Sequence, residues 1–307
     1  MQVYSQLDAP GSDELDLRCP PLPQTLMQAV ELSNQADPLE LEQAVQLVEK
    51  DPVAITRLLK IVNSAYYAQR GTITSIPRAV LILGPSSVVG IVMSMSMMEL
   101  RTALDKTTAA PFVNLVRHSV ATAFLAQRLI QHDPAYDSEK SAHTELAGAA
   151  FTAGMLHDLG KLVLLYNHPG KAVAFYVSSA GLGPDPLEAE RKALGFDHVA
   201  AGSFLTRSLN LPEALTEAIS YHHDPLTADG KPLLFKKLLY AIICASKVAS
   251  SMGYAFDRPL TWEQCMSDPV WSIIIDEGVY EYASAPVMIE EMVDAKARLE
   301  SYLDSVF

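Results

Sequence analysis

A histidine, an aspartate and a lysine interrupt an otherwise apolar run in the segment GMLHDLGKLVL, residues 154–164. They are His157, Asp158 and Lys161. Burying a carboxylate without a partner is energetically costly, so a cation or a set of hydrogen bonds should compensate Asp158. Imidazole and carboxylate groups together suit a borderline divalent cation such as zinc, iron, manganese or cobalt. The segment predicts either a metal centre or a hydrogen-bonded scaffold derived from one.

Five of the eight histidines lie at the ends or on the faces of predicted helices, and this makes them candidate ligands. They are His118, His157, His198, His222 and His223. Adjacent residues of a helix point about 100° apart, so neighbouring side chains converge most easily where a helix ends. Gly160 provides such an end for the His157–Asp158 dyad. Asp224-Pro225 provides one for the pair His222 and His223. A single histidine on a helix is more often structural than a ligand, and spacing alone does not show convergence between helices.

The elements that must position these side chains are predicted to be helices. Apolar residues recur at helical spacing over 26–32, 44–48 and 55–62, and no strand-like alternation is visible. Asp51-Pro52 is a typical helix start, and Gly84 a typical helix end. Longer helices are expected at 116–130, 236–252 and, with an acidic face, 287–305. The sequence predicts an all-α fold with a seam between two subdomains near 105–112.

The charge and the apolar content of the 307-residue chain exclude several classes of function. The net charge is −13 and no cluster of lysine or arginine is present, which argues against direct binding of nucleic acid or of an anionic membrane. The longest apolar run, residues 88–98, is too short to span a bilayer. The three cysteines form no CxxC pair, and the first residues lack the pattern of a signal peptide. We therefore expect a cytoplasmic protein.

Two groups of segments resemble the HDOD family, the HD-related output domain. The first comprises LRCPPLPQTLMQAVEL, VEKDPVAITRLLKIVNSAYY and TSIPRAVLILG; the second comprises HSVATAFLAQRL, AGMLHDLGKLVLL, LGFDHVAAGSFL and LPEALTEAISYHH. The resemblance covers about residues 18–225. It implies an HD-like helical bundle with an N-terminal helical subdomain. We expect a flexible lead over 1–17, the N-terminal subdomain over 18–108 and the HD-like subdomain with the C-terminal helices over 109–307.

The resemblance also implies roles for individual residues, because related HD enzymes are metal-dependent phosphohydrolases. In those enzymes the positions matched by His118, His157 and Asp158 hold an ion. In dinuclear relatives the positions of His198, His222 and His223 add ligands, and the lysine matched by Lys161 contacts phosphate. The resemblance therefore implies one or two divalent ions (iron, manganese or zinc), although a form without metal stays open.

The chain departs from the pattern of the active enzymes at the last ligand. Ser246 stands where these enzymes have a closing aspartate, and no Asp or Glu occurs between residues 230 and 256. The GYP signature of the cyclic-dinucleotide phosphodiesterases is missing after His223, where the sequence continues DPLTADG. A dinuclear hydrolase needs two ions to hold the attacking and the leaving oxygen, so the loss of an anionic ligand weakens that function.

We therefore expect a bacterial signal-transduction module that acts by binding a protein partner or a small nucleotide ligand, with a degenerate HD metal pocket. The alternative is a metal-dependent phosphohydrolase acting on a nucleotide or cyclic dinucleotide, in which Lys161 would stabilise negative charge. A third reading is a structural scaffold without a ligand. The acidic C-terminal helix is either a surface for docking or homo-oligomer formation, or a solvated face packed on the core.

Overall fold

The computed structural model describes residues 17–33, 39–64, 67, 71–136, 141–178, 185–224 and 230–306. Within these ranges every regular element is a helix, which confirms the all-α prediction. The first helices are α1 (Gln24–Ser33), α2 (Leu41–Glu49), α3 (Pro52–Val62), α4 (Ile76–Leu83), α5 (Pro85–Glu99) and the short 3-10 helix η1 (Leu100–Ala103). Next come α6 (Ala109–Gln131), α7 (Ser141–Leu156), α8 (Leu159–Asn167), α9 (Pro169–Ser178), α10 (Pro186–Leu194) and α11 (His198–Ser208). The last are α12 (Glu213–Tyr221), α13 (Leu233–Ala249), the π-helix η4 (Ser250–Tyr254), α14 (Trp262–Met266), α15 (Val270–Asp276), α16 (Ala285–Val293) and α17 (Lys296–Val306).

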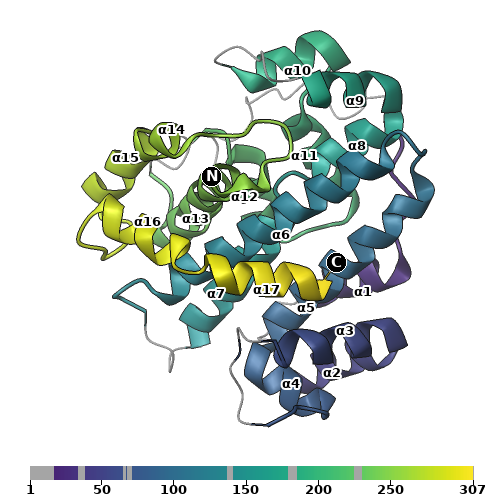
Figure 1. Ribbon diagram of the computed structural model, residues 1–307, viewed down its shortest axis with the longest axis vertical. Coiled ribbons are helices and arrows are strands. Elements are labelled where there is room, and N and C mark those ends of the chain that lie inside the picture. Colours follow the sequence, from purple (N-terminus) through teal and green to yellow (C-terminus); the bar gives the residue numbers. More distant parts are fainter. Residues whose placement is uncertain are drawn as a thin grey trace, which may run out of the picture.

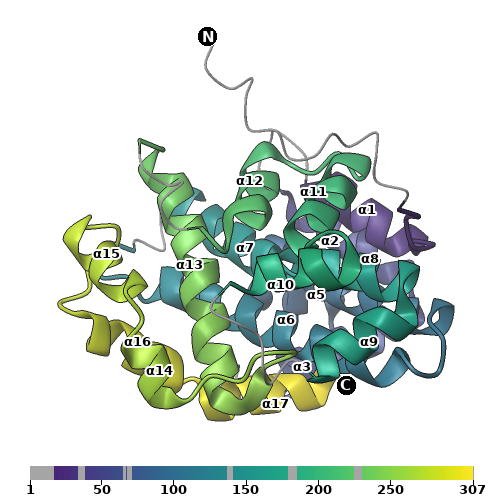
Figure 2. The same cartoon turned by 90° about the horizontal axis from the view of Figure 1, so that it is seen from above.

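The long helix α6 is the spine of the molecule and runs through its middle in both views (Figures 1 and 2). It packs most extensively against α7 and α13, and it also contacts α5, α8, α16 and α17. Its side chains from Val116 to Ile130 are almost all buried, because helices cover it on several sides. Methionines 93, 95 and 97 of α5 are also buried and pack in the core.

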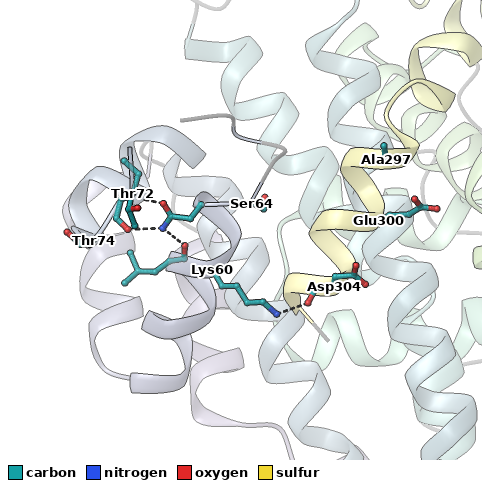
Figure 3. A pocket seen from close by; sticks show the side chains of 10 residues that line it. Lys60, Ser64, Thr72, Thr74, Ala297, Glu300 and Asp304 are labelled. Atoms are coloured by element: carbon teal, nitrogen blue, oxygen red, sulfur yellow. Dashed lines mark hydrogen bonds between the residues drawn. The ribbon is translucent and has the colours of Figure 1, made fainter. Parts of the chain in front are cut away.

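Helix α3 begins and helix α4 ends at the residues that the sequence indicated. The Asp51 carboxylate accepts a hydrogen bond from the Val53 backbone N–H at 2.8 Å and caps α3. Gly84, with φ of 83°, lies in the turn between α4 and α5, a conformation that glycine adopts without a steric penalty. The C-terminal helix α17 lies against α3, where the Lys60 ammonium donates to the carbonyl of Asp304 at 2.7 Å (Figure 3).

Two glycines allow the helices around the dyad to approach closely. A Cβ on Gly154 of α7 would lie 2.6 Å from the Cα of Ala123 in α6. A Cβ on Gly160 of α8 would lie 1.8 Å from the carbonyl oxygen of His198, the first residue of α11. Contacts this short exclude any larger side chain, so α7 and α8 meet their neighbours backbone to backbone.

Some boundaries differ from those expected. The predicted helix over 287–305 is two helices, α16 and α17, which separate at residues 294–295. The helix predicted over 236–252 begins earlier, at Leu233, and passes into η4 at Ser250. Almost all of the lead predicted over 1–17 lies outside the described residues, and the division between 108 and 109 stays a prediction. Among the described helices none alone is long and apolar enough to cross a membrane; α4 and α5 with η1 pass that test only as a pair bent by 104°.

Candidate metal centre

The six residues predicted as metal ligands lie together, although they come from four places in the fold. His118 lies within α6, His157 and Asp158 join α7 to α8, His198 begins α11, and His222 and His223 follow α12. All are buried except His223, which is exposed overall. The convergence brings together parts of the chain more than 100 residues apart. Whether these residues hold an ion stays a prediction.

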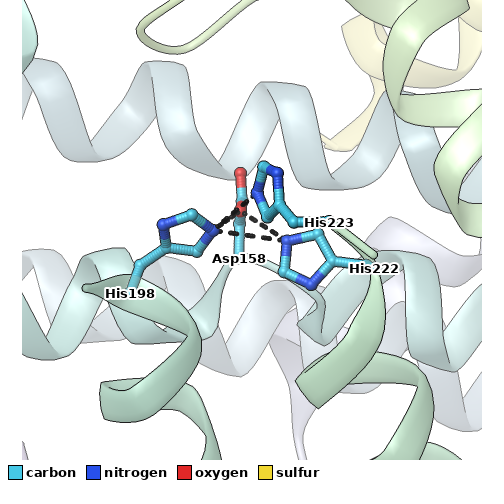
Figure 4. A group of neighbouring side chains, drawn as sticks. All are labelled: Asp158, His198, His222 and His223. Carbon is cyan, nitrogen blue, oxygen red and sulfur yellow. Dashed lines mark hydrogen bonds and ion pairs between the residues drawn. The ribbon is translucent and has the colours of Figure 1, made fainter. Parts of the chain in front are cut away.

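Three histidines and one oxygen of Asp158 form the first part of the centre, which we call the triple-histidine half. It consists of Asp158, His198, His222 and His223, whose side chains point toward one another (Figure 4). The Nε2 atom of His198 lies 3.3 Å from Nε2 of His222 and 3.0 Å from Nε2 of His223. Ligands about 2.0–2.2 Å from a shared ion lie about 3.0–3.4 Å from one another, so these nitrogens are spaced for one cation.

The other oxygen of Asp158 faces a second group, which we call the His118 half. Asp158 Oδ2 lies 3.7 Å from Nε2 of His118 and 3.5 Å from Nε2 of His157. By contrast, Oδ1 lies 3.4 Å from Nε2 of His198 and 3.6 Å from Nε2 of His222. Asp158 is therefore placed as a bridge, with one oxygen toward each half.

Backbone carbonyls fix the orientation of three imidazole rings. Nδ1 of His118 lies 2.9 Å from the carbonyl oxygen of Tyr254, Nδ1 of His157 lies 2.8 Å from that of Gly154, and Nδ1 of His222 lies 2.6 Å from that of Ile219. A carbonyl only accepts, so each Nδ1 carries the proton and each Nε2 presents its lone pair to the centre. This is the arrangement in which histidine binds a metal.

Glu190 orients the fourth ring, and sequence reasoning did not identify it. Its Oε2 atom lies 2.7 Å from both the backbone N–H and Nδ1 of His198, and its Oε1 accepts a hydrogen bond from the hydroxyl of Tyr176 at 3.1 Å. Glu190 is only 1% exposed. A buried carboxylate behind a histidine increases the basicity of the ring, which strengthens a bond from Nε2 to a cation.

Ser246 lies where the closing carboxylate was expected. Its hydroxyl lies 3.2 Å from Nε2 of His118, so a neutral group faces that ring. Within the described chain, no second carboxylate joins His118, His157 and Asp158 as a ligand set. Nε2 of His157 is buried and has no hydrogen-bond partner among the described residues. This unsatisfied lone pair and the carboxylate beside it fit a cation, but with fewer anionic ligands than a closed site has.

Lys161 lies between two carboxylates at the His118 half. Its ammonium is 2.9 Å from Asp158 Oδ2 and 3.1 Å from Oδ2 of Asp257, which lies in the segment after η4. The first carboxylate after Ser246 in the sequence therefore approaches the centre, but an ammonium group stands between it and Asp158. Burial lowers the pKa of Lys161, but Asp158 and Asp257 outweigh this and raise the pKa above its usual value, so the side chain is charged.

The imidazoles and the aspartate have opposite charge preferences. Burial lowers the pKa of His118, His157 and His222, most strongly for His157, so these rings are neutral. Burial favours a neutral Asp158 as well, yet Lys161 and the surrounding imidazoles hold its pKa well below the usual value. At His198, Glu190 outweighs the effect of burial and raises the pKa. The three neutral imidazoles and the ionised carboxylate supply donors that could bind a metal.

A cavity of about 510 Å³ leads to the centre between α13, α15 and the segment after η4. Apolar residues of α13 and α15, including Ile243 and Ile273, line one part of it, and Lys247 and Arg258 line another. A larger hollow of about 860 Å³ lies between α3 and α17 (Figure 3). That hollow contains no histidine, so the smaller cavity is the one that gives access to the centre.

Two of the remaining histidines have other partners. Nδ1 of His132 lies 3.2 Å from a carboxylate oxygen of Glu291, and His168 packs on Phe196 with ring centroids 5.8 Å apart. The side chain of His143 lies outside the described residues. Neither His132 nor His168 belongs to a described ligand set.

The chain is similar to known proteins over most of its length. Residues 19–225 match the HDOD domain family. Over 234 residues, or 75% of this chain, the sequence is 24% identical to an uncharacterized protein of Treponema pallidum (strain Nichols), and the match covers 42% of that protein.

Solved structures share the fold at low sequence identity. An HDOD domain protein of unknown function from Geobacter sulfurreducens aligns with a TM-score of 0.70, 19% identity and 94% of each chain. A protein provisionally named a phosphohydrolase, from Shewanella amazonensis SB2B, aligns with a TM-score of 0.65, 21% identity and 96% of each chain. A protein provisionally named a signal transduction protein, from Marinobacter aquaeolei VT8, gives 0.66 and 21%, over 95% of this chain and 62% of that one.

Proposed function

We propose, from the premise that the chain belongs to the HDOD family, that it is a regulatory module of bacterial signal transduction. In this proposal it acts by binding a protein partner or a small ligand rather than by turning over a substrate. The His/Asp centre would hold a divalent metal ion that fixes the arrangement of the helices around it. When it is bound, a divalent ion would link the helices by coordinating side chains from several of them.

The observation that carries this proposal is the neutral group at the His118 half. Ser246 offers a hydroxyl to His118 where an active dinuclear enzyme has a carboxylate. Two-ion hydrolysis needs both ions in order to hold the attacking and the leaving oxygen. A half with two imidazoles and one shared carboxylate oxygen, which also accepts a hydrogen bond from Lys161, supports that chemistry poorly.

The helices that meet at the centre suggest how occupancy would be transmitted. α8 packs on α11 through Gly160, and α12 contacts both α7 and α13. A cation shared by Asp158, His198 and His222 would join the start of α8, the start of α11 and the end of α12. An ion that binds only the folded state stabilises that state. Metal occupancy would therefore hold these three helices together more firmly.

A phosphohydrolase is the second candidate, and one observation favours it. The two oxygens of Asp158 face two separate histidine sets, as a bridging carboxylate of a dinuclear site does. Lys161 and Arg258 line the same cavity and could neutralise a phosphate. In this reading the ligand would be a nucleotide or a cyclic dinucleotide.

Metal analysis combined with a turnover assay separates the two functions. Purified protein would be analysed for iron, manganese and zinc, then incubated with cyclic dinucleotides, nucleoside phosphates and a chromogenic phosphodiester. The regulatory proposal predicts bound metal and no turnover above that of the Asp158→Asn variant. Turnover by the wild-type protein that Asp158→Asn abolishes would contradict it. Ser246→Asp is the matched test of the missing ligand, because it restores a carboxylate beside His118.

A further inference from the structure

The two halves of the centre differ in what already neutralises Asp158. On the side of the triple-histidine half, Oδ1 faces the lone pairs of His198 and His222. On the side of the His118 half, Oδ2 accepts a hydrogen bond from the ammonium of Lys161 at 2.9 Å. One oxygen of the bridge is thus available to a cation, whereas the other already has one.

Lys161 is held firmly where it lies. It is 5% exposed, it follows Asp158 by three residues in the first turn of α8, and Asp257 holds the ammonium from a second direction at 3.1 Å. The ring of Phe256 lies 5.5 Å from the same ammonium. A flexible surface lysine could move away from an incoming ion, but a lysine buried between two carboxylates would lose its contacts with both by moving.

The number of donors follows the same asymmetry, with three histidines in one half and two in the other. Nitrogen atoms in the triple-histidine half approach one another to 3.0 and 3.3 Å, the separation that a shared ion requires. In the triple-histidine half Nε2 of His198 and of His222 lies 3.4 and 3.6 Å from Asp158 Oδ1, and in the His118 half Nε2 of His157 and of His118 lies 3.5 and 3.7 Å from Oδ2. Ser246 supplies no charge to the His118 half. Of the two halves, only the triple-histidine half has a complete set of donors.

We propose that the centre binds one divalent ion, in the triple-histidine half, and that the ammonium of Lys161 takes the place of a second ion in the His118 half. The proposal deepens the proposed function and rests on it, because it explains how an HDOD module keeps a bridged His/Asp centre without becoming dinuclear. The charge of a second ion is supplied by a side chain of the protein, which offers no open coordination position to a substrate. A second divalent ion would be repelled by an ammonium in direct contact with Asp158, the carboxylate that this ion would have to share.

The test is the number of Mn²⁺ ions that each chain binds, measured by equilibrium dialysis with elemental analysis and by electron paramagnetic resonance. The wild-type protein is expected to bind one Mn²⁺ with the spectrum of an isolated ion, and a second ion at least about 100-fold more weakly. Lys161→Met keeps the length of the side chain and removes its charge, so it should bind two ions with a spin-coupled spectrum. Lys192→Met is the matched control, because Lys192 is exposed and pairs only with Glu188 among the described residues.

A pair of histidine variants keeps the proposal testable if Lys161→Met does not fold. His223→Gln should lose the ion, whereas His157→Gln should bind one ion with an affinity within about threefold of the wild type. Two ions of similar affinity in the wild-type protein, no bound ion, or loss of the ion in His157→Gln but not in His223→Gln would overturn the proposal. One bound ion together with turnover would contradict the regulatory function but not the single-ion inference. Two bound ions without turnover would contradict the single-ion inference but not the regulatory function.

Discussion

One carboxylate oxygen of Glu190 accepts both the backbone N–H and the Nδ1 proton of His198, each at 2.7 Å. The two bonds fix the first residue of α11 and the plane of its ring together. They also place a negative charge beside Nδ1 of His198, on the opposite side of the ring from the Nε2 atom that faces the centre. Glu190 is therefore a positioning residue for His198, although it does not point into the centre.

Replacing this carboxylate should weaken metal binding. Glu190→Gln removes the charge behind His198 with little change in volume, and loss of such an outer partner lowers metal affinity about 10- to 100-fold. Titration of the protein with Zn²⁺ in competition with a chelator measures the effect. Glu188→Gln is the control, because Glu188 lies on the same helix but is exposed and pairs with Lys192. Equal affinity in Glu190→Gln and the wild type would contradict the role of Glu190.

Backbone contact between α8 and α11 should make Gly160 sensitive to substitution. In Gly160→Ala the added Cβ would meet the carbonyl oxygen of His198, so the helices must separate. Overpacking of this kind costs about 1–3 kcal/mol of unfolding free energy. Gly170→Ala is the matched control, since a Cβ there meets no atom within 4 Å. Urea denaturation compares the two variants, and equal stabilities would show that α8 and α11 tolerate separation.

The dyad was predictable from the sequence because its chemistry lies in one short segment. The residues around the dyad were not predictable from the sequence. Glu190 occurs in the charged segment PLEAERKAL, where Glu188 has the same residue type and only the fold decides which of the two is buried. Asp257 follows directly after the interval 230–256 that lacks acidic residues, and the turn after η4 brings it to Lys161.

Helix periodicity predicted that these segments are helices better than it predicted where each helix begins and ends. The break between α16 and α17 interrupts a continuous amphipathic pattern and contains neither proline nor glycine, so the sequence carries no strong signal for it. The convergence of His118 with His198 depends on how α6, α8 and α11 pack, which no local pattern specifies.

The neutral histidines of the centre should make the metal-free protein less stable in mild acid. The folded-state pKa values of His118, His157 and His222 lie below the usual 6.5. Below pH 6.5 the unfolded chain therefore binds protons that the folded chain does not, and stability falls as the pH falls. His198 has a raised pKa and opposes this trend in part, because its contribution is present below pH 6.5 and is lost as the pH rises.

Thermal unfolding in a chelator between pH 7.5 and 5.5 measures this dependence. In His157→Gln the slope of unfolding free energy against pH should decrease by up to about 1.4 kcal/mol per pH unit, because one titrating group is removed. Asn63→Ala controls for general destabilisation, since it removes no titrating group and should keep the wild-type slope. A slope that is unchanged in His157→Gln would contradict the assignment of this ring as neutral.

Asn63 should stabilise the N-terminal helices without affecting the centre. Its side-chain amide donates to the carbonyl oxygens of Leu59 and Ile73, and its carbonyl accepts the N–H of Ile73 at 2.7 Å. The residue therefore ends α3 and fixes the extended segment that leads to α4. Asn63→Ala should lower the unfolding free energy by about 1–3 kcal/mol. Metal affinity should stay at the wild-type value, and a change in affinity would show that the two regions are coupled.

The location of the ion is measured most directly by anomalous diffraction from crystals of the protein loaded with Zn²⁺. The proposed centre predicts one strong anomalous peak about 2.0–2.2 Å from Nε2 of His198, His222 and His223, with Asp158 Oδ1 as the fourth ligand. The position between His118 and His157 should show no comparable peak. Peaks of equal height in both halves, or none near Asp158, would contradict the single-ion centre.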